Sequence, residues 1–349
     1  MKLAAQPENL LEAIALRSGM VPTPLGDTHV AFMLARTIMV ATKLGIFEIL
    51  QQPATAEAIA TQANTHRQAT LKMLNTLVHL GYAQFHQNQY SLTPLSRRWM
   101  LKASPQSVRD KMLMQFLEWE LVEHYEEYVR TGEPYRMHEV FSPEQWTLYQ
   151  RGMRAMAGTA AWEVARRTPI PRYAKDMLDI GGAHGYYSVA LCRRHRGLRS
   201  VILDLPEAIE EAQHILEQEQ MGGRVVHLPG NVLTDDLGTE AWDVVFMASL
   251  IHHFDEPTNR QLFKKIARAL RPGGVLVVQE FMRNKKPQIG DHLGALLDLF
   301  FAATSESGTW SVEEIAGWQQ AAGLVRRKPI WLRAIPRHAQ QVAKKSLKI

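Results

Sequence analysis

The feature that most constrains this chain is a glycine-rich stretch at residues 176–188, Asp-Met-Leu-Asp-Ile-Gly-Gly-Ala-His-Gly-Tyr-Tyr-Ser. An apolar run precedes the glycines and predicts a buried strand, while apolar residues at helical spacing follow them and predict a helix. Glycine permits positive φ and close approach of a ligand, and a helix N-terminus presents unpaired N–H groups. The stretch therefore predicts a strand, a tight turn and a helix start, with a purely structural turn as the alternative to a ligand-binding one.

The spacing of these glycines does not fit a dinucleotide-binding turn. That fingerprint, G-x-G-x-x-G, requires glycine two positions before Gly182, where this chain has Ile180. The rest of the chain must decide which ligand the turn receives.

Length and composition indicate a two-domain globular protein. The chain has 349 residues, 46% hydrophobic and 21% charged, without an apolar run of the roughly 20 residues that span a bilayer or a signal-peptide pattern. We expect a soluble, cytoplasmic protein. Its single cysteine, Cys192, excludes an intrachain disulfide and predicts a buried, inert thiol. The net charge is +5, and the basic residues are scattered along the sequence. We therefore expect no nucleic-acid partner.

The N-terminal third predicts three helices followed by a hairpin between residues 31 and 99, with its turn at residues 87–89. This order is typical of a winged helix. A DNA-reading module and a dimerisation module remain open. The expected third helix exposes few base-reading side chains, and apolar helices flank the module at 10–16, 30–39 and 112–121. Dimerisation is the favoured interpretation.

A further helix is predicted to begin at Ser142, with Pro143 in its first turn and Gln145 completing a capping box. Along this helix Tyr149 and Met153 belong to an apolar stripe. The stripe indicates either ordinary core packing or a wall for a flat organic molecule, since Met adapts to irregular shapes and packs on rings.

Downstream of the glycines, apolar strands alternate with helices. Strands are expected at 200–205, 224–228, 242–247 and 275–280, and helices at 207–220 and 261–270. The alternation predicts an α/β protein with a doubly wound parallel sheet, whose ligands bind at the carboxyl ends of the strands.

Polar residues stand at three of these strand ends. Asp204 is placed to accept hydrogen bonds from ribose hydroxyls, with a helix cap as the alternative, and Asn231 is placed to bond an adenine edge. The strand expected at 242–247 leads into His252 and His253, an unusual pair that favours function over structure. Because side chains alternate along an extended strand, the two rings are expected to point to opposite sides.

Several motifs together resemble one family over nearly the whole chain. They are the winged-helix front, Asp-Ile-Gly-Gly-x-x-Gly, Leu-Asp-Leu-Pro206, Pro-Gly-Asn-Val232, Ile-His-His-Phe254 and Leu-Arg-Pro-Gly-Gly274. The family is that of class I S-adenosylmethionine-dependent small-molecule O-methyltransferases, typified by plant caffeate and bacterial polyketide enzymes. The resemblance implies a Rossmann-like catalytic domain and a homodimer whose N-terminal domains swap helices and help cover the active site.

The resemblance also implies roles for individual residues. His252 falls at the general base and Glu280 at the acid that orients it, with Tyr149, Met153 and His253 lining the substrate site. S-adenosylmethionine is the implied cofactor, no metal is implied, and the implied acceptor is a hydroxyl of a small aromatic or polyketide-like molecule of secondary metabolism. The implied cofactor-binding residues are Asp179, Gly181, Gly182, Gly185, Asp204, Leu205, Asn231, Val232 and Ser249.

Three segments are expected on this basis. They are a winged-helix dimerisation domain at 1–105, a helical linker lining the active site at 106–170, and a methyltransferase domain at 171–349.

The chain departs from the family pattern in three places. Members often have Asp-Trp after the base, where this chain has His253-Phe254, and some have Lys where Ala248 stands. Plant members place a second acid beside the base, and the matching stretch here, 308–311, has only Glu306 nearby. C- or N-methylation, cofactor binding without methyl transfer and, more remotely, a ligand-sensing winged-helix regulator therefore remain alternatives.

Overall fold

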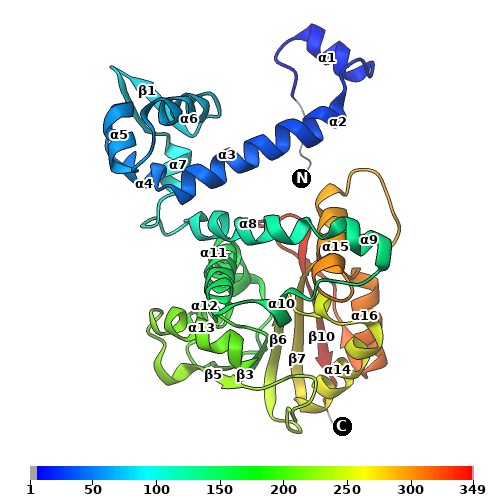
Figure 1. Cartoon of the computed structure of the whole chain (residues 1–349). Helices are drawn as coiled ribbons and strands as arrows, with labels where there is room; N and C mark the ends of the chain where they lie inside the picture. Colours follow the sequence, from blue (N-terminus) through cyan, green and yellow to red (C-terminus); the bar gives the residue numbers. More distant parts are fainter. Residues whose placement is uncertain (1–5, 348–349) are drawn as a thin grey trace. The chain divides into compact units, whose positions relative to one another are not determined.

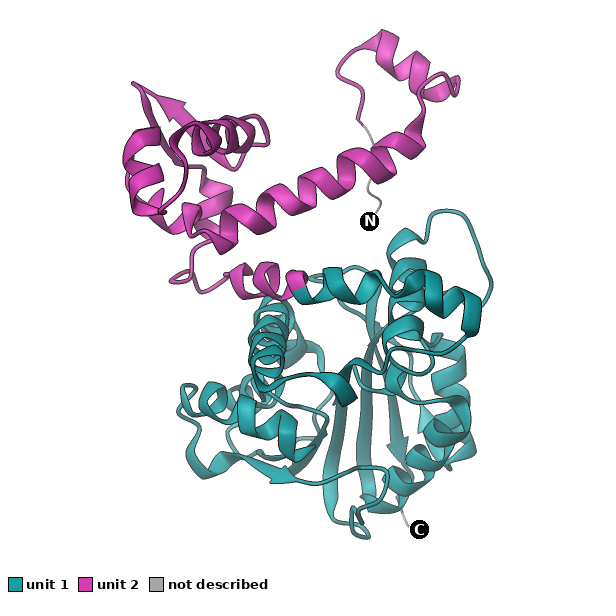
Figure 2. Cartoon of the chain, viewed as in Figure 1, with its two compact units in different colours: residues 1–2, 117–349 teal, residues 3–116 magenta. Residues whose placement is uncertain are grey.

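The computed structural model describes residues 6–347, which divide into two compact units (Figures 1 and 2). One unit ends at Phe116 and the other begins at Leu117, within helix α8 (Arg109–Val122). The second unit therefore includes residues 117–170 together with the sheet, and the expected boundaries at 105 and 170 stay predictions. Every helix between residues 6 and 347 is too short or too polar to cross a membrane.

The N-terminal unit is helical with one hairpin. The hairpin expected near residues 87–89 is confirmed, but four helices between residues 31 and 79 precede it, not the expected three. Gln87 and Asn88 turn the hairpin with positive φ of 46° and 61°, as a two-residue turn requires. Phe47, Leu74 and Leu92 belong to its buried core. The elements before α8 are α1 (Leu10–Arg17), α2 (Thr23–Leu25), the π-helical turn η1 (Gly26–Val30), α3 (Ala31–Lys43), α4 (Ile46–Ile49), α5 (Ala56–Gln62), α6 (Arg67–His79), β1 (Ala83–His86), β2 (Gln89–Leu92) and α7 (Pro94–Trp99).

The first helices of this unit leave large apolar side chains in solvent. Helix α1 buries no residue. Leu10, Leu11 and Met20 are 76%, 79% and 71% exposed, and Phe32 on α3 is 50% exposed. Single exposed apolar residues are ordinary, but a series over consecutive helices is typical of an interaction surface.

An eight-stranded sheet organises the C-terminal unit, in the order β5-β4-β3-β6-β7-β10-β8 with β9 paired to β10 (Figure 1). The first five strands pair in parallel, and β10 runs antiparallel to β7, β8 and β9. The strands are β3 (Asp176–Ile180), β4 (Arg199–Asp204), β5 (Val225–Pro229), β6 (Trp242–Ala248), β7 (Leu270–Phe281), β8 (Leu324–Arg326), β9 (Ile330–Trp331) and β10 (His338–Lys345).

The predicted doubly wound sheet is confirmed, but it is not purely parallel. The sequence analysis did not predict strand β10, because this strand carries buried polar residues such as Gln340 and Gln341 in place of an apolar run.

Helices cover both faces of the sheet, and neighbouring residues on one strand enter different cores. Met177 belongs to the cluster that includes Val164 and Val189, whereas Leu178 belongs to the one that includes Phe263. Because side chains on both faces of a strand are buried, the strands appear in the sequence as continuous apolar runs. The remaining elements are α9 (Tyr125–Thr131), α10 (Met137–Val140), α11 (Pro143–Arg167), α12 (Tyr186–Arg194), α13 (Pro206–Glu217), η2 (Gly222–Arg224), η3 (Ile251–His253), α14 (Glu256–Ala269), α15 (His292–Thr304) and α16 (Val312–Ala321).

Local signals explain where the helices begin. The capping box of Ser142 and Gln145 at the start of α11 is confirmed. Helix α14 begins five residues earlier than expected, because the Asp255 side chain accepts from the Thr258 N–H and caps it. Cys192 is fully buried, and burial raises the pKa of its thiol to about 12, as expected for an inert cysteine.

Candidate active site

Strand β3 leads directly into the glycine turn. Gly181 and Gly185 have positive φ of 69° and 71°, which side-chain-bearing residues rarely adopt. A Cβ at Gly185 would lie 2.7 Å from Ile202 Cδ1, and one at Gly182 would lie 2.5 Å from Asp179 Oδ2. The protein's own packing therefore requires these glycines, whatever ligand the turn receives.

Asp179 on β3 is buried and incompletely paired. Its Oδ2 accepts a 2.6 Å hydrogen bond from Ser188 Oγ, while Oδ1 is buried without a partner among residues 6–347. Burial raises the pKa of this carboxyl to about 7; the Ser188 hydrogen bond opposes the shift and the charge of Asp204 adds to it. Since an unpaired buried carboxylate oxygen costs free energy, Oδ1 suits a cationic group of a bound molecule, such as an ammonium.

Asp204 closes β4 and binds backbone on two sides. Oδ2 accepts from the Ala183 N–H and Oδ1 from the Leu205 N–H, each at 2.8 Å. The residue does not cap α13, whose N-cap is Leu205 and which has no side-chain cap. Burial raises the pKa of Asp204 to about 6, against the effect of the two backbone hydrogen bonds. Each carboxylate oxygen still has a lone pair for a ribose hydroxyl.

The segment after β5 lies beside Asp204. The Gly230 N–H donates to the Asp204 carbonyl at 2.9 Å, and Asn231 Oδ1 accepts from the backbone N–H two residues on, also at 2.9 Å. Val232 is buried, and its carbonyl accepts from Lys265 Nζ at 2.7 Å. The structure therefore brings the glycine turn, Asp204 and Asn231 to one edge of the sheet.

His227 on β5 also belongs to this region, although the sequence analysis missed it. Its Nε2 lies 2.7 Å from the carbonyl oxygen of Ala183, a non-glycine residue with φ of 38°. Asp204 binds the Ala183 N–H and His227 contacts the Ala183 carbonyl, so the two side chains hold the backbone of this residue at both its polar groups. A histidine within the apolar run at 225–229 was the available signal.

The turn η3, just beyond β6, carries the predicted base. His252 is 2% exposed, and its Nδ1 lies 3.1 Å from Glu280 Oε2. The other oxygen, Oε1, accepts from the N–H groups of Leu250 and Ile251 at 2.7 and 2.9 Å. The carboxylate is thereby fixed and favours the tautomer with a proton on Nδ1, which leaves Nε2 as the proton acceptor. Ser249, which precedes the turn, has a positive φ of 53°.

The expectation that the two histidines point to opposite sides is wrong. Because they lie in a 3-10 turn and not on an extended strand, the centroids of the His252 and His253 rings are 4.2 Å apart. His253 Nδ1 lies 2.7 Å from Ser305 Oγ. Burial lowers the pKa of His253 well below its usual value, and the imidazoles of His252 and His138 act in the same direction. His253 is a neutral ring beside the expected base.

An aromatic ring lies against the base where a second acid was sought. Phe301 on α15 stacks on His252, with ring centroids 3.8 Å apart at an interplanar angle of 22°. Glu306 is exposed, and no contact described for residues 6–347 joins it to His252. Sequence reasoning missed Phe301 because α15 was not predicted.

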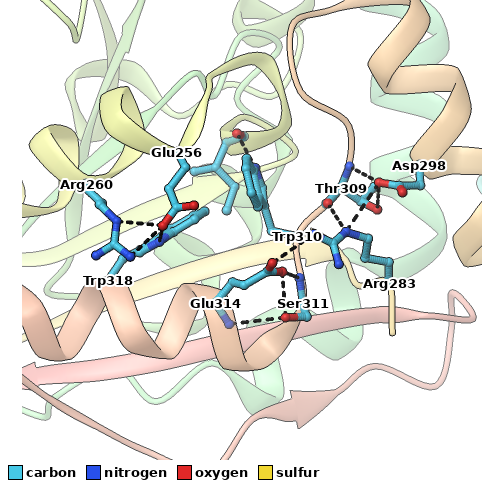
Figure 3. Close-up of polar contacts among 10 residues, drawn as sticks. Glu256, Arg260, Arg283, Asp298, Thr309, Trp310, Ser311, Glu314 and Trp318 are labelled. Carbon is cyan, nitrogen blue, oxygen red and sulfur yellow. Dashed lines mark hydrogen bonds and ion pairs between the residues drawn. The ribbon is translucent and has the colours of Figure 1, made fainter. Parts of the chain in front are cut away.

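The stretch 308–311 takes part in a polar network (Figure 3). The N–H and Oγ1 of Thr309 donate to Asp298 Oδ1 at 2.7 and 2.8 Å, and Arg283 Nε donates to the Thr309 carbonyl at 2.7 Å. Trp310 Nε1 donates to the Ile251 carbonyl at 3.0 Å. The network therefore anchors η3, and with it the base, to the segment between α15 and α16.

Helix α10 places the His138 ring next to His253, and helix α11 packs two aromatic rings against His138. The His138 ring on α10 lies 4.6 Å from that of His253 and 5.1 Å from those of Trp146 and Tyr149, measured between centroids. Burial raises the pKa of the Tyr149 phenol. Met153 is half-buried one turn further along α11. His138 was missed, since nothing in the sequence relates a histidine in a short loop helix to the strand ends.

The stripe on α11 packs differently on different turns, and its use as a wall for a flat molecule stays a prediction. Ala160 is fully buried in the core beneath the sheet, whereas Trp146 and Tyr149 belong to the aromatic cluster around His138.

Comparison with known families matches most of the chain. Residues 120–324 match the model of the O-methyltransferase domain. Residues 27–102 match that of the O-methyltransferase dimerisation domain.

Individual methyltransferases are also similar to this chain. The chain is 27% identical over 305 residues to the mitomycin biosynthesis 6-O-methyltransferase of Streptomyces lavendulae, covering 83% of this chain and 85% of that one. It is 26% identical over 269 residues to the N,N-dimethyltransferase OxyT of Streptomyces rimosus, covering 72% and 76%. Human N-acetylserotonin methyltransferase, solved in complex with SAM, superposes with a TM-score of 0.82 at 18% identity over 98% of this chain and 100% of that one, which shows a shared fold.

Proposed function

The chain belongs to the O-methyltransferase family, and we propose that it transfers a methyl group from S-adenosylmethionine to a hydroxyl of a small aromatic or polyketide-like molecule. The observation that carries the proposal is the buried His252–Glu280 pair at the sheet edge that also holds the glycine turn and Asp204. A base beside a nucleoside-binding edge fits an acceptor that must lose a proton.

The residues proposed to bind the cofactor supply polar groups that match its polar parts. The glycine turn receives the methionine part, Asp179 Oδ1 its ammonium, Asp204 the ribose hydroxyls and Asn231 the adenine edge. When bound, the cofactor supplies an electrophilic methyl group on a positively charged sulfur. The unpaired Oδ1 of Asp179 is the structural observation that supports this fit. The other proposed cofactor residues are Leu205 beside Asp204, Val232 beside Asn231, and Ser249 directly after β6.

His252 is proposed to take the acceptor's proton at Nε2. Moving a proton from an ordinary phenol to an ordinary imidazole is uphill by about 3.5 pKa units, or about 5 kcal/mol. The Glu280 carboxylate, 3.1 Å from Nδ1, orients the ring so that Nε2 is the proton acceptor. Tyr149, Met153 and His253 are proposed to line the acceptor site.

The N-terminal unit is proposed to be a winged helix that forms a homodimer. Helices α5 and α6 followed by the hairpin β1–β2 support the winged helix, and the exposed apolar side chains of α1 and α3 support a covering partner. Sedimentation as a monomer at micromolar concentration would contradict the dimer. A cytoplasmic location and a part in secondary metabolism stay predictions.

Nitrogen methylation is the second candidate, because one relative of similar identity is an N,N-dimethyltransferase. The proposed function is tested by incubating the protein with S-adenosylmethionine labelled in its methyl group and a panel of phenols, hydroxyquinones and amines. We expect label in an ether of at least one phenolic compound. Label only in amines or on carbon would replace the oxygen acceptor, and no transfer at all would overturn the enzymatic assignment.

A further inference from the structure

His138 lies beside the base but has no role in the mechanism above. Its ring centroid is 4.6 Å from that of His253, which is 4.2 Å from that of His252. On its other sides it packs against Trp146, Tyr149 and Phe141, with centroids 5.1, 5.1 and 5.7 Å away. The ring is therefore part of the aromatic wall and one ring removed from the base.

The Nε2 atom of His138 is unpaired. This atom is buried and has no hydrogen-bond partner in the described part of the chain. Burial lowers the pKa of the ring to about 3, and His252 acts in the same direction, so the ring is neutral. A neutral imidazole offers one N–H donor and one nitrogen acceptor. Because an unpaired buried polar atom costs free energy, Nε2 suits a polar atom of a bound molecule.

We propose that His138 determines acceptor specificity, and that its Nε2 hydrogen-bonds an uncharged oxygen on a flat aromatic acceptor, away from the hydroxyl that is methylated. This inference rests on the proposed function. The surrounding aromatic faces favour a planar ring. Charged substituents are disfavoured, because His138 and His253 are both neutral and a buried charge without a counter-charge is costly.

The class of oxygen is a ring carbonyl or a second hydroxyl, and matched acceptors separate the two. The probes are the positional isomers of hydroxytetralone, the corresponding dihydroxytetralins and plain hydroxytetralin, which share one bicyclic skeleton. Hydroxynaphthoates represent the charged class. For each compound, kcat/KM is measured with saturating S-adenosylmethionine.

The variants are His138→Phe, which keeps a ring without polar atoms, and His138→Gln, whose amide places a polar group near the position of Nε2. The matched control is His195→Phe at the end of α12, where another buried and unpaired Nε2 lies outside the aromatic cluster. Thermal unfolding and S-adenosylhomocysteine binding by calorimetry show whether each variant retains its fold and its cofactor site.

We expect the wild type to prefer at least one oxygenated tetralin over plain hydroxytetralin by about 5- to 150-fold, as one unpaired buried polar atom implies. His138→Phe should reduce that preference to about twofold or less with little effect on plain hydroxytetralin, His138→Gln should restore part of it, and His195→Phe should leave it unchanged. Three results would overturn the proposal. They are a wild type that shows no such preference, a wild type that prefers hydroxynaphthoates, and a preference for the oxygenated tetralins that survives in His138→Phe. If no compound is methylated, including plain hydroxytetralin, the proposed function falls for these acceptors and this inference with it.

Discussion

The two halves of the proposed active site are built from different groups. The cofactor half presents carboxylates and backbone groups at the ends of neighbouring parallel strands, with Asp179 and Asp204 as its principal side chains. The acceptor half presents neutral rings, among them His138, His253 and Phe301, from α10, η3 and α15.

The difference teaches how one site can receive two unlike ligands. Buried acids with raised pKa values favour a cationic ligand, since ionising them is easier when a positive charge arrives. Neutral aromatic walls favour a flat, uncharged acceptor and leave proton transfer to the His252–Glu280 pair. Substitutions in one half should therefore spare the ligand of the other.

The largest effect is expected from His252→Ala. Removal of the general base should lower kcat by roughly 10²- to 10⁴-fold while leaving cofactor affinity within about twofold, because the ring is not part of the cofactor half. Steady-state rates and calorimetry with S-adenosylhomocysteine check both points. An equal loss in cofactor binding would contradict the separation of the halves.

Glu280→Gln should follow, with a loss in kcat on the order of 10²-fold. If the amide oxygen keeps the bonds to the Leu250 and Ile251 N–H groups, its NH2 faces His252 Nδ1 and enforces the tautomer with a proton on Nε2. That tautomer cannot accept the acceptor's proton, as when the acid of a catalytic triad is amidated. Activity close to that of the wild type would show that the carboxylate does not orient the base.

The charged half can be tested through pH. The pKa of Asp179 is about 7 in the folded protein, against about 3.9 in an unfolded chain. The folded state thus binds its proton more tightly, and this contribution to stability is fully present below about pH 4 and is lost as pH rises towards 7. Asp204, at about 6, adds to the lower part of this window. Urea unfolding at pH 4.5 to 8 measures the slope.

Ligand binding should show the reverse dependence. An ammonium group favours the ionised form of Asp179, so S-adenosylhomocysteine affinity should rise by up to about tenfold per unit between pH 5 and 7, with protons released on binding. Calorimetry in buffers of different ionisation enthalpy detects that release. Asp179→Asn should flatten both curves, and a wild-type affinity independent of pH would rule out the assigned role of Oδ1.

Asp204→Asn should weaken cofactor binding by about tenfold, since it replaces a charge-assisted hydrogen bond to the ribose with a neutral one. The acceptor KM should change by less than about twofold. Comparable changes in the two constants would mean that the halves are coupled.

His253→Ala is expected to have the smallest effect, a loss of about fivefold or less that appears mainly in the acceptor KM. The ring is neutral, bonds to Ser305 and contributes contact area, not a charge or a proton. A loss in kcat larger than that of His252→Ala would exchange the roles of the two histidines.

The sequence by itself determined which residues meet in the proposed cofactor half. Asp204 and Asn231 directly follow apolar strands of a βαβ series, and the carboxyl ends of parallel strands meet at one edge, so their proximity followed from strand order alone. The glycine turn was likewise readable, because positive φ and close packing leave few other residues possible there. His252 and Glu280 were named from the family resemblance, and their contact agrees with the pairing of β6 and β7.

Only the tertiary structure decided the acceptor half. His138, Phe301 and Ser305 lie in or beside loop-connected helices whose positions no hydrophobic period encodes. Over long sequence separations, Phe301 packs on His252, His138 packs on His253, and Ser305 hydrogen-bonds His253. The orientation of His253 was predicted wrongly for the same reason, since a 3-10 turn after β6 replaced the extended strand end that the alternation rule assumes. Strand ends follow from local periodicity, whereas the packing of rings against one another depends on how separate elements meet.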